Sequence, residues 1–176
     1  MLTVSQRLYP FIIAFETLHD GDLSTIGLEP KLDPTGNWTE GYGRLMTKNG
    51  KAMTVKQYPT LKSILPYRTI ETEKEARLAL VVDVEAFATK VNKWLTVKVT
   101  QWEFDALVSH AYNCGYSGTM YTLVNGRAKE QAIKNWFTSK YITSRGVFLQ
   151  GLQYRRNDEY EIWAGINYKR EYKRSV

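Results

Sequence analysis

One segment carries most of the structural information in this sequence: Asp33-Pro34-Thr35-Gly36-Asn37-Trp38-Thr39-Glu40-Gly41-Tyr42-Gly43. Its first four residues have Pro at the second turn position and Gly at the fourth, a pattern that predicts a type I turn. The residues that follow predict a strand whose side chains alternate between two faces. One face carries Trp38, Glu40 and Tyr42, whereas the other carries Asn37, Thr39 and two glycines.

The second face of this strand is nearly bare, because a single hydroxyl lies between an amide and two residues without side chains. Such a face cannot pack against a core, but it would let a flat polymer lie close to the backbone. The alternative is a tight hairpin whose glycines serve only the backbone geometry. The residues alone leave both interpretations open.

Glu16 stands upstream, at the end of a short apolar helix. Helical spacing relates Leu8, Phe11, Ile12, Phe15 and Leu18. We expect Pro10 at the first helical position, after a separate turn over 5–9, and a stop near Gly21. The negative end of the helix dipole and partial burial would both disfavour an ionised Glu16, which suits a general acid. The alternative is a solvated surface glutamate.

The rest of the chain reads mainly as helices. The capping-box pattern Thr72-x-x-Glu75 predicts a long helix to about Val91. A second capping box, Thr100-x-x-Glu103, opens a helix to about Tyr112, and further helices are expected at about 119–125, 129–139 and 153–163. The pair Asn49-Gly50 predicts a type I′ hairpin.

Three motifs occur in order along the chain. The first is Phe15-Glu16-Thr17-Leu18 followed by Leu32–Gly43, the second is Thr100-Gln101-Trp102-Glu103-Phe104-Asp105-Ala106-Leu107-Val108-Ser109 followed by Tyr112–Gly115, and the third is Gly151-Leu152-Gln153-Tyr154-Arg155-Arg156 with Glu159 and Trp163. Together they resemble the phage-type lysozymes, the endolysins of glycoside hydrolase family 24. The similarity runs from about residue 11 to residue 164.

The resemblance implies an α+β, lysozyme-like fold in one catalytic domain over 1–176. A β-rich lobe would occupy about 17–68 and a helical lobe about 1–16 and 92–176. A long helix at about 72–91 would join them, with the active-site cleft between the lobes.

The resemblance also implies the site residues. Glu16 would be the general acid, and Asp33 and Thr39, six positions apart as in the family pattern, would hold the attacking water. The residues expected to touch the saccharide are Gly43, Leu45, Tyr112 and Thr119. Arg155 or Arg156 would brace the Glu16 carboxylate. No cofactor and no metal are implied.

The sequence departs from the family pattern in two stretches. Glu16 and Asp33 lie seventeen positions apart, more than is usual in the family, so the region 20–29 is an insertion. It adds Asp20, Asp22 and Glu29 as rival carboxylates, but only Asp33 has the following Thr-x-Gly-Tyr-Gly context. The stretch 46–68 is also longer than usual. Arg44 stands where the family often has His, and an ion pair built on that His could persist with a different geometry.

Composition narrows the class of protein. A lone cysteine, Cys114, excludes an internal disulfide and fits a reducing cytosol. Two histidines, His19 and His110, disfavour a zinc site of His and Cys ligands. The net charge of +6 would draw the protein to anionic walls, although the basic residues near the end, Lys169, Arg170, Lys173 and Arg174, also fit a solvated tail.

The segment 1–18 is too short and too mixed for a membrane span and lacks the features of a signal peptide. We therefore expect no integral membrane segment. By family analogy, a monomer would stay in the host cytoplasm until a holin-type partner opens the way to the periplasmic wall. Its substrate would be peptidoglycan and not nucleic acid.

Three functions remain open at this point. The first is an inverting muramidase that cleaves the β-1,4 bond between N-acetylmuramic acid and N-acetylglucosamine. The second is a lytic transglycosylase, which needs one Glu and forms an anhydro sugar. The third is a non-enzymatic binder of anionic polymers. Asp33 and Thr39 argue against the second, because a transglycosylase does not hold a nucleophilic water.

Overall fold

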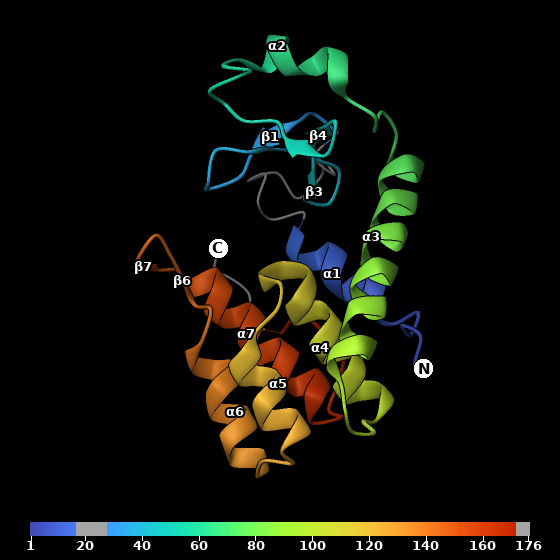
Figure 1. The fold of residues 1–176 in the computed structure, drawn as a ribbon, viewed down its shortest axis with the longest axis vertical. Helices are drawn as coiled ribbons and strands as arrows, with labels where there is room; N and C mark the ends of the chain where they lie inside the picture. Colours follow the sequence, from blue (N-terminus) through green and yellow to red (C-terminus); the bar gives the residue numbers. More distant parts are fainter. Residues whose placement is uncertain (17–27, 172–176) are drawn as a thin grey trace. The chain divides into compact units, whose positions relative to one another are not determined.

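The computed structural model describes residues 1–16 and 28–171, and the chain divides into two compact units. We call residues 13–83 the sheet unit, and residues 1–12 with residues 84 onward the helical unit. Helices α1 (Leu8–Glu16) and α3 (Glu73–Trp94) each belong partly to both units (Figure 1). Several residues discussed above lie outside the described part of the chain: Leu18, His19, Asp20, Gly21, Asp22, Lys173 and Arg174.

The sheet unit is built on a three-stranded antiparallel sheet in the order β1-β2-β3. Its strands are β1 (Lys31–Leu32), β2 (Trp38–Glu40) and β3 (Arg44–Leu45). The amide of Gly36 donates to the carbonyl of Asp33 over 3.0 Å, the bond that closes the predicted turn. The predicted alternation is also confirmed, since Trp38, Glu40 and Tyr42 are buried.

Trp38 anchors a small core of its own within the sheet unit. Its side chain packs with Met46, Met53 and Ile64, and its indole N–H donates to the carbonyl of Tyr58 over 2.8 Å. Ile64 comes from the short helix α2 (Leu61–Ile64), which the 3-10 turn η2 (Leu65–Tyr67) continues. The longer stretch 46–68 therefore supplies much of the core beneath the sheet.

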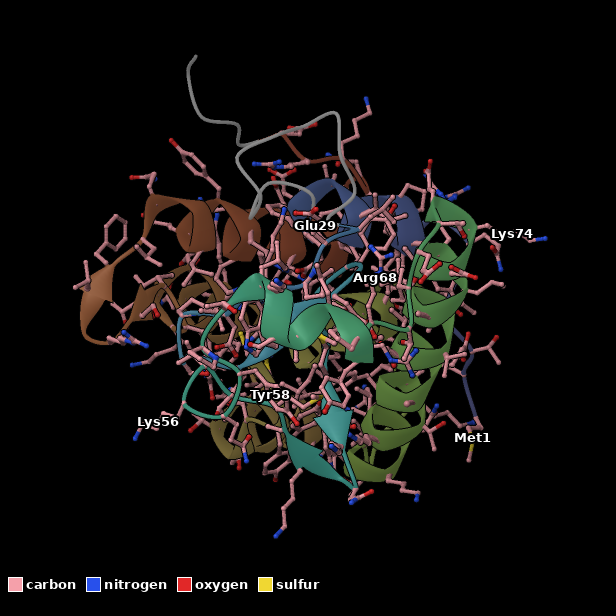
Figure 2. All side chains as sticks on the ribbon, turned by 90° about the horizontal axis from the view of Figure 1, so that it is seen from above. Met1, Glu29, Lys56, Tyr58, Arg68 and Lys74 are labelled. Carbon is pink, nitrogen blue, oxygen red and sulfur yellow. The ribbon has the colours of Figure 1, made fainter. Side chains whose placement is uncertain are left out.

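The predicted second hairpin is also present in the sheet unit. Strands β4 (Thr47–Lys48) and β5 (Lys51–Ala52) pair with two residues between them. Asn49 and Gly50 have φ of +52° and +74°, as a type I′ turn requires. Basic side chains of this unit, including Lys56 and Lys74, extend into solvent (Figure 2).

The helical unit contains the predicted series of helices. They are α4 (Gln101–Cys114), α5 (Gly118–Asn125), α6 (Glu130–Ser139) and α7 (Gln150–Trp163), and α7 packs against both α4 and α6. Both predicted capping boxes form, at Thr72 with Glu75 and at Thr100 with Glu103. These helices and small antiparallel sheets confirm an α+β fold. No helix in the described ranges is both long and apolar enough to cross a membrane.

Three local expectations need correction. Pro10 is the third residue of α1 and not the first. It fits there because no N–H group of a first helical turn has an intrahelical acceptor, so a missing N–H loses nothing. Helix α7 begins at Gln150, earlier than predicted. A short hairpin of β6 (Thr143–Ser144) and β7 (Val147–Phe148) precedes it and was not expected.

A buried ionic network ties α7 to α4 inside the helical unit. Glu159 is fully buried, and its Oε1 accepts from Ser109 Oγ over 2.8 Å, from Arg156 over 2.9 Å and from Arg155 Nε over 3.2 Å. Arg156 also donates to Asn113 Oδ1 over 3.0 Å. Because buried charges are tolerated only when they are paired, these groups depend on one another.

His110 lies in the same part of the helical unit, on the buried stretch of α4. Its ring packs edge-on against Trp136, Phe137 and Tyr141, and its Nε2 is buried without a hydrogen-bond partner. Burial and the positive charges of Arg156 and Arg155 hold the pKa of His110 well below 6.5. The folded protein therefore keeps this imidazole neutral.

We predict that replacing His110 by Phe weakens the loss of stability in acid. Below about pH 6.5 the unfolded chain takes up a proton at residue 110 that the folded chain refuses, so the free energy of unfolding falls as the pH is lowered. Urea unfolding at pH 7 and pH 5 measures the effect. The wild type should lose more stability between these pH values than His110→Phe, and equal losses would contradict the assignment of a neutral buried His110.

Candidate active site

The three predicted catalytic residues all belong to the sheet unit. Glu16 is the last residue of α1, Asp33 opens the turn between β1 and β2, and Thr39 is the middle residue of β2. Each residue is therefore positioned by a different local element. All three are partly exposed, as groups that meet a substrate must be.

The Asp33 carboxylate is surrounded by donors from its own turn. Oδ1 accepts from the amides of Thr35 and Asn37, each over 2.8 Å, and from the Thr35 hydroxyl over 2.8 Å. Oδ2 accepts from the Asn37 side-chain amide over 3.1 Å. Partial burial raises the pKa of Asp33, but the hydrogen bonds from Asn37 and Thr35 outweigh it, so the pKa lies below its usual range. Asp33 is thus an ionised acceptor that also stabilises its turn.

Thr39 contributes an oxygen whose hydrogen is already used. Its hydroxyl donates to the carbonyl of Lys31 over 3.1 Å, across the pair of strands β1 and β2. The lone pairs of Oγ1 point elsewhere and can accept a hydrogen from water. Leu45 is the partner of Thr39 in the register of β2 and β3, so the two side chains share a face of the sheet. Leu45 is 44% exposed there, as a residue that contacts substrate needs to be.

Gly43 connects this sheet to Glu16. It lies in the β2–β3 turn with φ +84°, a conformation that favours glycine. A Cβ placed on Gly43 would lie 3.1 Å from Oε2 of Glu16. The backbone conformation therefore favours glycine here, and any larger residue would press on the Glu16 carboxylate. The structure brings together Glu16 and Gly43 in this way, and it brings together Thr39 and Leu45.

The other predicted site residues belong to the helical unit. Tyr112 is half-buried on α4 with its ring 5.8 Å from that of Phe87, and Thr119 is exposed on α5. Arg156 and Arg155 are both held by Glu159, as described above. Contacts of Tyr112 and Thr119 with a saccharide, and of an arginine with Glu16, remain predictions.

The sequence analysis missed the partners of Glu40 in the sheet unit, and it left an ion pair at Arg44 possible. Glu40 accepts hydrogen bonds from Thr69 and Ile70, and Arg44 lies 3.6 Å from Asp83 of α3. The ion pair that the sequence left possible at Arg44 is therefore present. A signal for Glu40 was present, because a charged residue on the buried face of a strand, between Trp38 and Tyr42, must have a partner.

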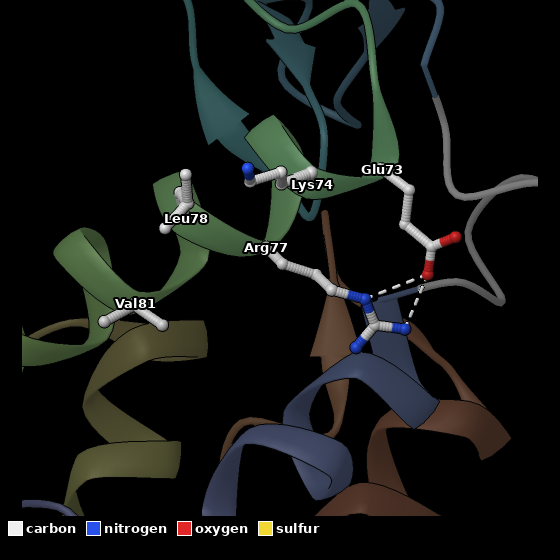
Figure 3. A pocket seen from close by; sticks show the side chains of 5 residues that line it. All are labelled: Glu73, Lys74, Arg77, Leu78 and Val81. Carbon is white, nitrogen blue, oxygen red and sulfur yellow. Dashed lines mark hydrogen bonds and ion pairs between the residues drawn. The ribbon is translucent and has the colours of Figure 1, made fainter.

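A shallow hollow lies on α3 within this unit. Glu73, Lys74, Arg77, Leu78 and Val81 line it, and Glu73 pairs with Arg77 over 2.6 Å (Figure 3). Its one carboxylate is exposed and already paired, so the hollow offers neither an acid nor a base for catalysis. Among the residues that the structure describes, no group of three His, Cys, Asp or Glu side chains could hold a metal ion.

Several known proteins are similar to this chain. The chain matches the family model of phage lysozyme over residues 23–159. It is 35% identical over 133 residues to the endolysin of Bacillus phage B103, a match that covers 70% of this chain and 49% of that protein. The endolysin of Bacillus phage PZA is 34% identical over 137 residues, covering 72% of this chain and 52% of that protein. The chain thus spans about half the length of the curated relatives it matches.

Solved structures extend the match to nearly the whole chain. The endolysin of Escherichia coli O157:H7 phage FAHEc1 is 30% identical with a TM-score of 0.63, over 92% of this chain and 93% of that one. The active form of the P1 phage endolysin Lyz has the same TM-score at 17% identity, over 92% and 85% of the two chains, and shows the fold alone. The family model and these relatives together show that this chain belongs to the phage lysozyme family.

Proposed function

We propose that this chain hydrolyses the β-1,4 bond between N-acetylmuramic acid and N-acetylglucosamine in peptidoglycan. Membership of the phage lysozyme family supports the substrate class. The observation that carries the mechanism is the pair of water acceptors in one hairpin: an ionised Asp33, and a Thr39 oxygen whose hydrogen is used by Lys31.

In this proposal each of the three catalytic residues has one role in the hydrolysis. Glu16 donates a proton to the glycosidic oxygen as the bond to the leaving sugar breaks. Asp33 accepts a proton from water, and Thr39 orients that water by accepting its other hydrogen. The water oxygen attacks the anomeric carbon from the opposite face, so the configuration inverts. This geometry requires roughly 6.5–9.5 Å between the two carboxyl groups.

The remaining roles follow the same proposal. Gly43 and Leu45 line the sugar path in the sheet unit, and Tyr112 and Thr119 contribute contacts from the helical unit. Arg155 or Arg156 braces the Glu16 carboxylate. The protein acts as a monomer. It is made in the host cytoplasm and reaches the periplasmic wall through a membrane lesion made by a holin-type partner.

Glu16→Gln tests the acid directly. Gln keeps the shape of the side chain but has no proton of suitable acidity, so turnover should fall by about 10²–10⁴-fold. The measurement is the loss of turbidity of permeabilised Gram-negative cells, with circular dichroism as the control for folding. Lysis by Glu16→Gln at the wild-type rate would instead indicate a non-enzymatic binder of anionic polymers.

Asp33→Asn tests the choice of the second carboxylate. Asn cannot accept a proton from water, so hydrolysis of purified wall should fall by about tenfold or more. Asp20→Asn is the matched control, and it should remain within about twofold of the wild type, because Asp20 lacks the following Thr-x-Gly-Tyr-Gly context of Asp33. Equal damage from the two changes would show that Asp33 is wrongly assigned.

Mass spectrometry of the same wall digests identifies the reaction. Water as the nucleophile leaves a reducing end on N-acetylmuramic acid. An anhydro sugar at that end would overturn hydrolysis in favour of a lytic transglycosylase.

A further inference from the structure

Glu40 is a buried carboxylate on the strand that carries Thr39. The two residues are neighbours in β2, so their side chains leave the strand on opposite faces. Thr39 is on the partly exposed face, whereas Glu40 is 5% exposed on the other. Neither the hydrolytic mechanism nor the hydrophobic core needs a charge at this position.

Three donors from one distant segment hold the Glu40 carboxylate. Oε2 accepts from the amides of Thr69 and Ile70 over 2.8 and 3.2 Å. Oε1 accepts from the Thr69 hydroxyl over 2.5 Å. Hydrogen bonds to an ionised acceptor are about twice as strong as neutral ones, and two of the donors are backbone groups with fixed directions. This arrangement ties β2 to the segment that leads into α3.

The neighbouring residue packs against the same segment. Gly41 has φ +55°, and a Cβ there would lie only 2.8 Å from the Ile70 side chain. Polar contacts from Glu40 and close packing at Gly41 therefore meet at Ile70. Farther along the hairpin, Arg44 pairs with Asp83 over 3.6 Å. This ion pair links the same hairpin to helix α3 itself.

The same hairpin meets Glu16 through Gly43. The β2–β3 hairpin is therefore fixed at Glu40 and Gly41 and adjoins the acid at Gly43. A shift of the hairpin at Glu40 would move the Thr39 oxygen and the Gly43 backbone together. Displacements of about 1 Å can cost large factors in rate, because the reacting groups leave their productive geometry.

We propose that Glu40 is a positioning residue for the water-holding Thr39. Through its bonds to Thr69 and Ile70, it sets where β2 places the Thr39 oxygen relative to Glu16. The inference rests on the proposed function, because it takes Thr39 as the group that orients the water. Glu40 itself touches neither substrate nor water.

The test separates positioning from simple stabilisation. Glu40→Gln preserves the volume of the side chain but removes the charge and turns an NH₂ group toward donors. At a temperature where the variant is fully folded, kcat on purified wall should fall by about tenfold while KM stays within about twofold. In a Thr39→Ala background the same change should lower kcat by less than about twofold, because the route through Thr39 is already lost.

Glu75→Gln is the matched control. The Glu75 carboxylate also accepts from two backbone amides, those of Glu71 and Thr72, but it caps α3 and does not contact β2. It should lower the melting temperature slightly and leave kcat unchanged. Thr69→Val is the second variant if Glu40→Gln does not fold, since it removes the hydroxyl that donates to Glu40. It should lower kcat when Thr39 is present and should leave kcat nearly unchanged in the Thr39→Ala background.

Any other result of these kcat measurements would contradict a specific part of the proposal. An unchanged kcat for folded Glu40→Gln, or for Thr69→Val in its place, would reduce Glu40 to a stabilising residue. An equal loss in the Thr39→Ala background would mean that Glu40 acts by another route. Full activity of Thr39→Ala alone would overturn the proposed role of Thr39, and with it the positioning role.

Discussion

The close approach of a glycine backbone to a carboxylate is the constraint on which the proposed site depends. At Gly43 the space that a Cβ would fill lies 3.1 Å from Oε2 of Glu16, and the φ of +84° independently favours glycine. The turn between β2 and β3 can therefore reach the end of α1 without covering the acid. The strand that precedes the turn carries Thr39, so the same approach sets where the water-holding oxygen lies relative to the proton donor.

Three carboxylates of the chain have different roles because their surroundings and hydrogen-bond partners differ. Asp33 is partly exposed, and short hydrogen bonds within its turn lower its pKa, so it remains an acceptor for water. Glu40 is buried and accepts three hydrogen bonds from Thr69 and Ile70, which suits fixing a strand, and its burial keeps it away from substrate. Glu159 is buried between two arginines and holds helices of the other unit together. Sequence alone would not separate these roles, because they depend on burial and, for Glu40 and Glu159, on partners distant in the chain.

Local patterns predicted the elements well, because their causes are local. The capping boxes at Thr72 and Thr100 and the Asn49-Gly50 turn each involve atoms within a few residues, and the alternation along β2 follows from the pleat. The unexpected β6–β7 hairpin turns at Arg145 and Gly146, both with positive φ, and arginine gives no turn signal. Glu40 could be recognised as a residue in need of a partner, but Thr69 and Ile70 could not be named, because nothing in the sequence near β2 specifies them.

Replacement of Gly43 by Ala tests the central claim most directly, with Gly50→Ala as its matched control. Both glycines have positive φ, at +84° and +74°, so both changes strain the backbone, but only a Cβ on Gly43 meets Glu16, whereas nothing lies within 4 Å of one on Gly50. We predict that wall hydrolysis by folded Gly43→Ala falls by about tenfold or more relative to Gly50→Ala, because the acid and the hairpin are forced apart. Equal activity of the two folded variants would contradict the account.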